Sequence, residues 1–431
     1  MLSRVPVLRH AAFRRVWLSQ SLSVLGDRIV LAALPLFVTD LTGSATDVGF
    51  VLGAQSLPLV VFLLAGGVWA DRLPRARLAA ATDLVRFAVQ GIVAVLILVD
   101  VVEVWQLVVA GLVFGAAEAF SQPAVTGLLP QTVEEDEFQE ANAVVHTSMS
   151  AAGMLGPAIG TALVVGLGAG VAFAADAGTF AVSALLLYGV TARTRRSVAA
   201  PEPDAPGTEL PSWRRELSAG FAEVRTRAWV WITILSATAF LLLSFAPLFV
   251  LGPTVAKDEY GSTAFFGVVL IVFGAGSLIG GIVGLRWRPR HPMPLAFVLF
   301  TFWSLVGVAM SLGAPRGVVG LLALAGGFSV ALFGVWWATL LAQEIPPEAL
   351  SRVSAFDWMG SLALLPLGFA LSGPAGELFG AGTVLIAGGL LTVAVTLAAG
   401  LLPRSMRELR LDPPDQARSD ARTASEATSR S

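Results

Sequence analysis

The chain has 431 residues, of which 55% are hydrophobic and 13% are charged, with a mean hydropathy of +0.77 and a net charge of -2. Soluble proteins carry about 25% charged residues, so this composition excludes an ordinary soluble protein and indicates a membrane protein. The absence of Cys excludes disulfides, thiol catalysis and Cys-ligated metals, and the three histidines lie far apart. We therefore expect no metal site, no cofactor and no catalytic residue.

The predicted elements are long apolar helices. Residues Met1 to Arg15 are basic and run into the first span without a small-residue cleavage site, so we expect a retained helix and not a signal peptide. A helix needs about 20 apolar residues to cross a bilayer. Twelve stretches meet this condition: 17–39, 47–70, 78–99, 104–126, 145–167, 171–190, 229–251, 263–285, 294–313, 317–341, 355–377 and 380–402.

A polar break divides the spans into six plus six. The sequence predicts an N-terminal six-helix half over 1–190, a cytoplasmic linker over 191–228 and a C-terminal six-helix half over 229–402. The linker is rich in Pro and contains an amphipathic segment from Trp213 to Arg227. Residues 403–431 are polar and rich in Ser, Arg and Asp, so we expect a disordered cytoplasmic tail.

The basic residues predict the orientation of the chain. Almost all of them lie at the termini and in alternate loops, and the opposite set of loops holds only Lys257 and Arg316. Because cytoplasmic loops are enriched in Lys and Arg, both termini are expected in the cytoplasm. Arg outnumbers Lys strongly, which is typical of GC-rich bacterial genomes. We therefore expect a multi-pass protein of the bacterial inner membrane, surrounded by the lipid bilayer.

The loop between the second and third spans is densely charged. It contains one acid, Asp71, after Gly67, followed by Arg72, Arg75 and Arg77. Charge at this density between two spans must lie at a membrane face.

The fifth span carries small residues at helical spacing. Gly153, Gly156 and Gly160 allow a neighbouring helix to approach closely, and Pro157 is expected to kink the helix.

Ionisable residues inside the spans are costly and are therefore candidates for function. Asp27 in the first span is expected to exchange a proton or to bind a cationic substrate. Alternatively, it forms a structural ion pair with Arg28 or Arg86. Glu118 in the fourth span, one turn before Gln122, is expected to couple protons or contact substrate, unless it is a paired structural acid. Gln122 and Arg86 are further candidates for proton coupling or substrate contact.

Three further acids have structural interpretations. Asp83 lies one turn before Arg86, which favours an intrahelical ion pair. Asp176 is expected in the outer third of the sixth span, with Thr179 and interfacial groups satisfying it. Asp357 follows Ser354 by three residues, which resembles a capping box at the start of the eleventh span.

The two halves resemble each other weakly at an offset of about 212 residues. The sequence LLPQ at 128–131 leads into an acidic stretch and a span, as does LLAQ at 340–343. Duplicated halves predict a binding cavity at their interface near the midplane of the membrane. Aromatic residues are candidates for substrate contact there, although most aromatic residues in such a chain serve packing: Phe120, Phe240, Phe245, Phe333, Trp336, Trp337 and Trp358.

The motifs resemble those of the major facilitator superfamily over nearly the whole chain. Gly67, Asp71, Arg72, Arg75 and Arg77 fit its motif A, with Pro74 in place of the usual Gly, and Gly153 to Gly160 resembles motif C of proton-coupled exporters. The arginine of motif B is missing. Other segments resemble the subgroup of enterobactin and macrolide exporters: Gly26-Asp27, Gln122-Pro123-Ala124, Leu129-Pro130-Gln131 and Ala141-Asn142-Ala143.

This resemblance implies an all-α membrane fold of twelve helices in two pseudo-symmetric halves. It also implies that Asp71 approaches the start of the eleventh span, where we expect it to latch the halves in the outward-facing state. No Gly-x-x-x-x-Gly-Lys-Ser/Thr motif or nucleotide-binding domain is present, so an ion gradient must supply the energy.

We therefore expect a monomeric, proton-coupled exporter of a small amphipathic molecule such as a drug, siderophore or natural product, with no nucleic-acid partner. The alternative is an importer or a lysophospholipid flippase of the same fold. A non-transporting receptor or an intramembrane enzyme is disfavoured, because the chain lacks a Cys nucleophile and paired histidines.

Overall fold

The computed structural model describes residues 6–134, 137–188, 190 and 224–411 and is helical without strands over these residues. Twelve helical stretches of this part are long and apolar enough to cross a membrane, as the sequence predicts. The N-terminal half contains η2 (Pro6–Arg9), α1 (Ala11–Thr42), α2 (Ala45–Arg72), α3 (Arg75–Leu98), α4 (Val104–Leu128), η3 (Leu129–Gln131), α5 (Phe138–Leu167) and α6 (Ala169–Leu187).

Two spans of the C-terminal half are interrupted. The seventh consists of α8 (Ala228–Phe240), a π-helical turn (Leu241–Phe245) and α9 (Ala246–Tyr260), and the eleventh consists of α13 (Pro347–Leu362) and α14 (Leu365–Phe379). Pro247 and Pro366 lie in the first turns of α9 and α14, where the missing backbone N–H of proline is tolerated. The remaining helices are α10 (Ala264–Arg286), α11 (Pro292–Ser311), α12 (Arg316–Glu344), α15 (Ala381–Leu401) and the short α16 (Arg404–Arg407).

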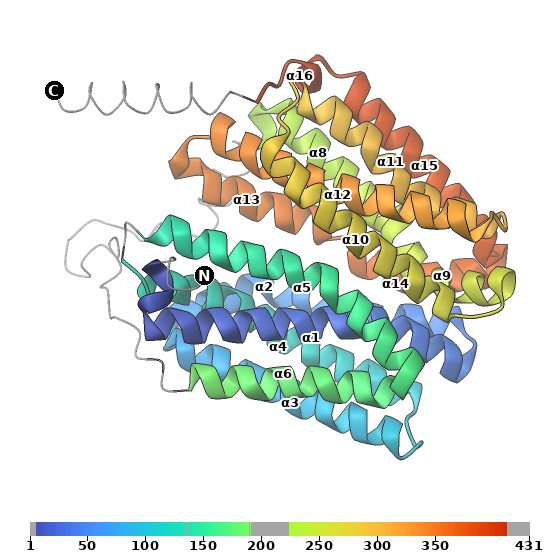
Figure 1. Cartoon of the computed structure of the whole chain (residues 1–431), viewed down its shortest axis with the longest axis horizontal. Coiled ribbons are helices and arrows are strands. Elements are labelled where there is room, and N and C mark those ends of the chain that lie inside the picture. Colours follow the sequence, from blue (N-terminus) through green and yellow to red (C-terminus); the bar gives the residue numbers. More distant parts are fainter. Residues whose placement is uncertain (1–5, 135–136, 189, 191–223, 412–431) are drawn as a thin grey trace.

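Helix pairing repeats between the halves (Figure 1). In the N-terminal half α2 packs on α4, α3 on α6 and α1 on α5; in the C-terminal half α10 packs on α12, α11 on α15 and α9 on α14. Gly115 and Gly327, which are 212 residues apart, each allow the partner helix to approach closely. A β-carbon on either glycine would lie 1.9 Å from a carbonyl oxygen of the partner helix. This pairing establishes the two pseudo-symmetric halves expected from the sequence.

The halves contact each other at the end of the molecule opposite the start of α1, which we call the distal end. There α2 packs on α14 and α5 on α10. Ser44 donates a hydrogen bond to Glu377 (3.2 Å), and Thr263 donates one to Asp40 (3.3 Å). Towards the other end, which we call the proximal end and where α1 begins and α16 lies, the halves separate in Figure 1.

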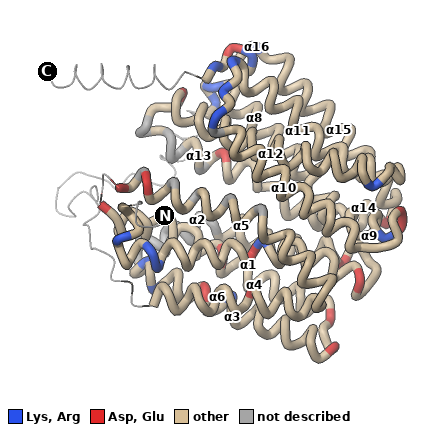
Figure 2. The backbone as a smooth tube through the Cα atoms, viewed as in Figure 1, with Lys and Arg blue, Asp and Glu red and all other residues tan. Residues whose placement is uncertain are grey.

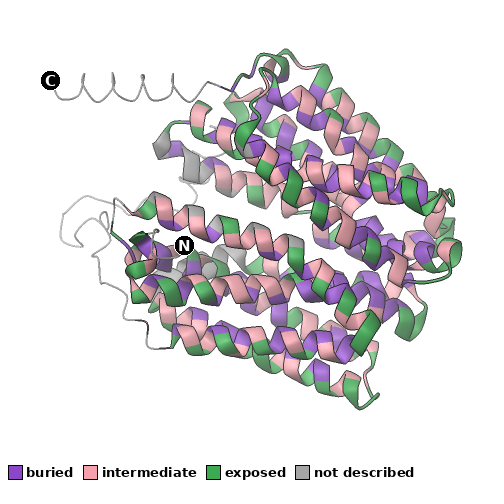
Figure 3. Cartoon of the chain, viewed as in Figure 1, coloured by how far each residue is buried: buried purple, intermediate pink, exposed green. Residues whose placement is uncertain are grey.

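The surface of the bundle exposes many large apolar side chains, and Figure 3 shows where exposed residues lie along the helices. Ile92, Leu185 and Leu321 expose 61%, 74% and 67% of their surface, whereas charged residues gather mainly near the helix ends (Figure 2). Large exposed apolar side chains on long helices suit contact with lipid.

Two expectations differ from the structure. Helix α13 begins at Pro347, so Ser354 and Asp357 lie within it and form no capping box; Asp357 instead accepts a hydrogen bond from the Trp337 indole (2.8 Å). The first residues of the tail are also ordered, because Met406 in α16 is fully buried among side chains of the C-terminal half. Residues 412–431 and most of the linker, 191–223 with Trp213, lie outside the described residues.

Candidate functional site: a polar cluster inside the N-terminal half

A polar stripe joins α3 and α6. Asp83, Arg86 and Gln90 follow one face of α3 at spacings of three and four residues, and Asp176 and Ser183 follow one face of α6 at a spacing of seven. The two helices are antiparallel, so Ser183 donates a hydrogen bond to Asp83, and the Gln90 amide donates one to Oδ2 of Asp176 (2.6 Å). All five residues are buried.

Arg86 is the centre of this stripe. Its Nη2 donates hydrogen bonds to Asp83 Oδ1 and to Ser121 Oγ on α4 (2.9 Å). Its guanidinium lies over the Phe180 ring, 4.4 Å from the centroid. The intrahelical pair of Asp83 and Arg86 predicted from the sequence is therefore present, and the cation is further stabilised by an aromatic face.

Asp27 approaches the same arginine from α1. Its Oδ2 lies 3.8 Å from Nη1 of Arg86, and its side chain is 26% exposed. The other oxygen, Oδ1, is buried without a hydrogen-bond partner among the described residues. Of the two ion-pair partners considered from the sequence, Arg28 and Arg86, the structure brings Asp27 to Arg86.

Helix α4 brings Glu118 and Gln122 to different environments. Glu118 is half-buried and lies within electrostatic range of Asp27, Arg86 and Arg28, whereas Gln122 is exposed. The residue between them that contacts the cluster is Ser121. The cluster therefore combines four carboxyls, those of Asp27, Asp83, Glu118 and Asp176, with a single buried arginine; Arg28 is exposed.

Asp176 differs from its expected role. It lies near the middle of α6 and is fully buried, and not in the outer third. The Thr179 hydroxyl bonds the backbone oxygen of Asp176 (2.7 Å) and not its carboxyl, which Gln90 holds instead. Gln90, Ser121 and Ser183 carry no charge, so only their spacing relative to Asp83 and Asp176 could have indicated them in the sequence.

The glycines of α5 position α1. A β-carbon on Gly156 would lie 2.2 Å from the Arg28 β-carbon, and one on Gly160 would lie 2.3 Å from the Ile29 carbonyl oxygen. The predicted close approach therefore occurs at Gly156 and Gly160, directly beside Asp27. Gly153 does not take part, because a β-carbon there would meet no atom within 4 Å. Pro157 lies inside α5 between the two contact glycines.

The charged loop lies away from this cluster, at the proximal end. Arg75 at the start of α3 donates a hydrogen bond to the Gly127 carbonyl oxygen (2.6 Å), and Arg77 is exposed. The backbone of α2 extends through Gly67 and Asp71 to Arg72, but the side chains of this segment lie outside the described part of the structure.

The C-terminal half carries aromatic rings where the N-terminal half carries charges. The centroid of Phe300 lies 4.4 Å from that of Phe240 and 5.2 Å from that of Phe333, which stacks on Trp337 at 6.2 Å. The π-helical turn follows Phe240 and ends at Phe245, and such turns occur frequently at functional sites. Trp336 is fully buried and donates to the Trp287 carbonyl oxygen (3.0 Å), Trp358 is 67% exposed, and Phe120 stacks with Phe62.

Among the described residues, no group of three His, Cys, Asp or Glu side chains could hold a metal ion.

Comparison with known proteins gives similarity along most of the chain. The family model of the Major Facilitator Superfamily matches residues 16–364. Macrolide efflux protein A of Streptococcus pyogenes is 23% identical over 422 residues, covering 93% of this chain and 97% of that protein. The multidrug efflux pump Tap of Mycolicibacterium fortuitum is 28% identical (90% and 94% covered), and the enterobactin exporter EntS of Escherichia coli is 26% identical (96% of each).

Solved structures share the fold. A bacterial homologue of the human lysosomal transporter Spinster, in an inward-facing and unoccupied conformation, superposes with a TM-score of 0.64 at 15% identity, covering 93% of this chain and 98% of that chain. The nucleoside transporter NupG has a TM-score of 0.67 at 13% identity, with 90% and 98% covered.

Proposed function

Because the chain belongs to the Major Facilitator Superfamily, we propose that this membrane transporter exports a small amphipathic molecule in exchange for protons. The observation that carries the proposal is the environment of Asp27. Its carboxyl is partly open, it lies 3.8 Å from a buried arginine that is already hydrogen-bonded to Asp83, and one of its oxygens has no partner among the described residues.

Charge balance supports proton exchange at this cluster. One buried cation, Arg86, faces four carboxyls in a region from which water is largely excluded. Buried charges without partners are strongly unfavourable, so the carboxyls that Arg86 does not neutralise need protons. Asp27 and Glu118 are half-buried, and we infer that they load and release these protons during transport.

The arrangement of the halves supports alternating access. Basic residues gather at the proximal end, including Arg14, Arg75, Arg290 and Arg404, whereas the distal end has Lys257 and Arg316 among the described residues. By the distribution of Lys and Arg, the proximal end and both termini are cytoplasmic. With the halves in contact at the distal end, we infer an inward-open state.

The chemistry of the two halves supports an amphipathic substrate. The acidic cluster belongs to the N-terminal half, and the row from Phe240 to Trp337 belongs to the C-terminal half. The names of the relatives point to macrolides and to enterobactin as the first compounds to examine. We infer that the apolar body of the substrate contacts the aromatic rings while its polar group lies near Asp27.

The test uses the purified full-length protein in liposomes with an imposed pH gradient. We expect uphill movement of a macrolide or of enterobactin that a protonophore abolishes. Asp27→Asn should lose uphill movement but keep downhill exchange, because the carboxyl can no longer carry a proton. Asp258→Asn, an exposed acid at the distal end, is the matched control and should behave as wild type. Uphill movement without a proton gradient would overturn the proposal.

The direction of substrate transport distinguishes export from the alternative functions. An importer, or a lysophospholipid flippase, would move its substrate into the cytoplasm or between leaflets. Measuring flux in both directions, with lysophospholipid as an additional substrate, therefore decides between export and these alternatives.

A further inference from the structure

Asp176 is a buried acid that the proposed function counts among the four carboxyls near Arg86 but does not use in loading or releasing protons. Its side chain is fully inside the N-terminal half. Oδ2 accepts the Gln90 amide at 2.6 Å, and Oδ1 has no hydrogen-bond partner among the described residues. Gln90 is neutral, so it orients the carboxyl without balancing a negative charge. A buried carboxylate with only one such donor is unfavourable, and a proton on Oδ1 would remove the charge.

The charged groups around Asp176 are already engaged. Arg86 on α3 is hydrogen-bonded to Asp83 and lies 3.8 Å from Asp27 on α1. Glu118 on α4 also interacts electrostatically with Arg86. In the described part of the chain, no basic side chain lies within ion-pairing distance of Asp176. Arg86 acts on Asp176 electrostatically but forms no ion pair with it, so a proton is the means by which the charge of Asp176 can be removed.

Gly26 brings Asp176 next to the candidate coupling residue. A β-carbon on Gly26 would lie 2.2 Å from Oδ1 of Asp176 and 2.3 Å from Oγ1 of Thr179, so any side chain there would displace the carboxyl. Asp27 follows Gly26 directly in α1, and its own Oδ1 is also buried without a partner in the described structure. Asp27 and Asp176 therefore each have one buried carboxyl oxygen without a partner in the described structure, and the two carboxyls lie within electrostatic range of each other.

We propose that Asp176 carries an exchangeable proton on Oδ1 and trades it with Asp27 across Gly26. In the exchange the O–H bond of Asp176 breaks and an O–H bond forms on Asp27. Asp176 becomes a carboxylate that accepts a hydrogen bond from Gln90. Asp27 becomes neutral, so Arg86 remains paired with Asp83 alone. The charge of the cluster is unchanged. The presence of a proton on Asp176 does not depend on the proposed function, whereas the use of this proton in driving export rests on it.

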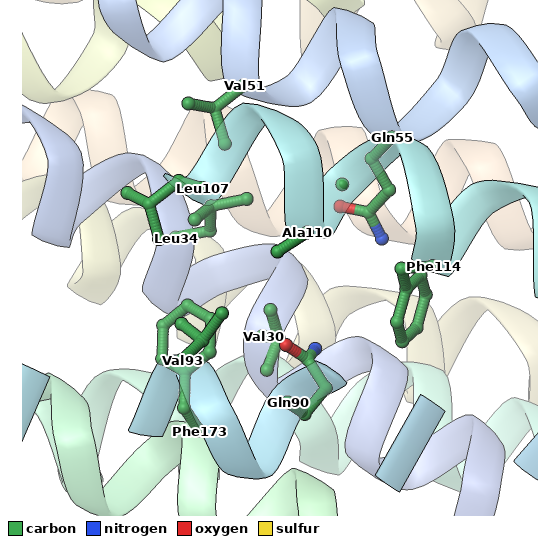
Figure 4. A pocket seen from close by; sticks show the side chains of 11 residues that line it. Val30, Leu34, Val51, Gln55, Gln90, Val93, Leu107, Ala110, Phe114 and Phe173 are labelled. Atoms are coloured by element: carbon green, nitrogen blue, oxygen red, sulfur yellow. The ribbon is translucent and has the colours of Figure 1, made fainter. Parts of the chain in front are cut away.

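A small cavity lies beside Gln90, which holds the Asp176 carboxyl. Residues from α1, α2, α3, α4 and α6 line it, and Gln55 and Gln90 are its polar side chains (Figure 4). Phe114 and Phe173 form part of its apolar wall. The cavity therefore borders the amide that holds Asp176.

The experiment is infrared difference spectroscopy of the full-length protein in lipid nanodiscs, titrated in H2O and in D2O. Protonated carboxyls give a carbonyl band that shifts on deuteration. We expect wild type to show exchangeable bands from both acids, Asp176→Asn to lose one of them, and Asp27→Asn to lose the other. If Asp176→Asn keeps every wild-type band, the proposal is overturned.

Glycine variants test the exchange while keeping both acids. Gly26→Ala should slow deuteration of the Asp176 band, because the new methyl group separates the two carboxyls. Gly178→Ala on α6 is the matched control, since a β-carbon there meets nothing within 4 Å, and its rates should equal wild type. Equal rates in Gly26→Ala and wild type would contradict transfer across Gly26. These variants also decide the matter if Asp176→Asn does not fold.

The same samples separate this inference from the proposed function. Liposomes that show no proton-driven transport while the Asp176 band is present would overturn proton-coupled export alone. Proton-driven transport in a protein without an exchangeable Asp176 band would overturn the assignment of Asp176 alone.

Discussion

Gly26 of α1 and Asp176 of α6 are in such close contact that a β-carbon on Gly26 would lie 2.2 Å from the Asp176 carboxyl oxygen. This contact brings a fully buried acid to the residue that precedes Asp27. Helix packing in the N-terminal half thus gathers four carboxyls around Arg86, and the proposed function depends on how the charges in this cluster are balanced.

Removing the central cation should destabilise the protein. Arg86→Met leaves Asp83 buried without its partner, and we expect a loss of about 3–5 kcal/mol in the free energy of unfolding. Thermal unfolding in detergent measures it. The double variant Arg86→Met/Asp83→Leu should recover much of the loss, because the uncompensated charge is gone. A single variant as stable as wild type would show that the pair contributes little.

Substitution of equivalent glycines in the two halves by alanine should reduce stability to a similar extent. Gly115→Ala and Gly327→Ala each force a β-carbon to 1.9 Å from a carbonyl oxygen on the facing helix. Overpacking of this kind costs about 1–3 kcal/mol. Gly91→Ala, where a β-carbon meets nothing within 4 Å, serves as the control and should not destabilise. Loss of stability in only one of the two variants would contradict the equivalent packing.

Opening of the distal end should be required for transport. Ser44 and Glu377 are hydrogen-bonded across the halves at 3.2 Å, and the chain has no native Cys. In Ser44→Cys/Glu377→Cys, a short bifunctional thiol reagent should therefore join the halves and stop transport. Each single variant treated with the same reagent controls for side reactions. Normal transport by the cross-linked double variant would exclude separation of the halves at this end.

Asp71 should influence the conformational equilibrium and not substrate affinity. From the resemblance of its loop to motif A, we expect Asp71→Asn to shift the population towards the inward-facing state, because the latch to the start of the eleventh span is lost. Spin-label distances between the proximal ends of the halves measure the shift, and substrate binding to the same sample provides the control. Unchanged distances would count against the latch.

The sequence predicts the spans well because hydrophobicity over about 20 residues is a strong signal. It is less informative at their ends. The capping-box pattern at Ser354 and Asp357 suggested a helix start, but Pro347 begins the helix. Proline favours the first turn of a helix and would have been the better indicator.

In the candidate site, a contact within one helix could be predicted from the sequence, whereas contacts between helices could not. The pair of Asp83 and Arg86 follows from a spacing of three residues within one helix. The approach of Asp27 to Arg86, and that of Gly26 to Asp176, depends on how α1 and α3 each pack against α6, which no local pattern specifies. Neutral partners such as Gln90 are missed for a further reason, since an amide is not by itself unusual in a span.

The most direct test of the central claim measures proton flux when substrate is added to proteoliposomes without any imposed gradient. A pH-sensitive dye inside the vesicles follows the protons. We expect substrate movement to drive protons in the opposite direction in wild type and in Asp258→Asn, and we expect Asp27→Asn to move substrate without protons. Substrate movement in the wild-type protein with no change in internal pH would contradict proton exchange at Asp27.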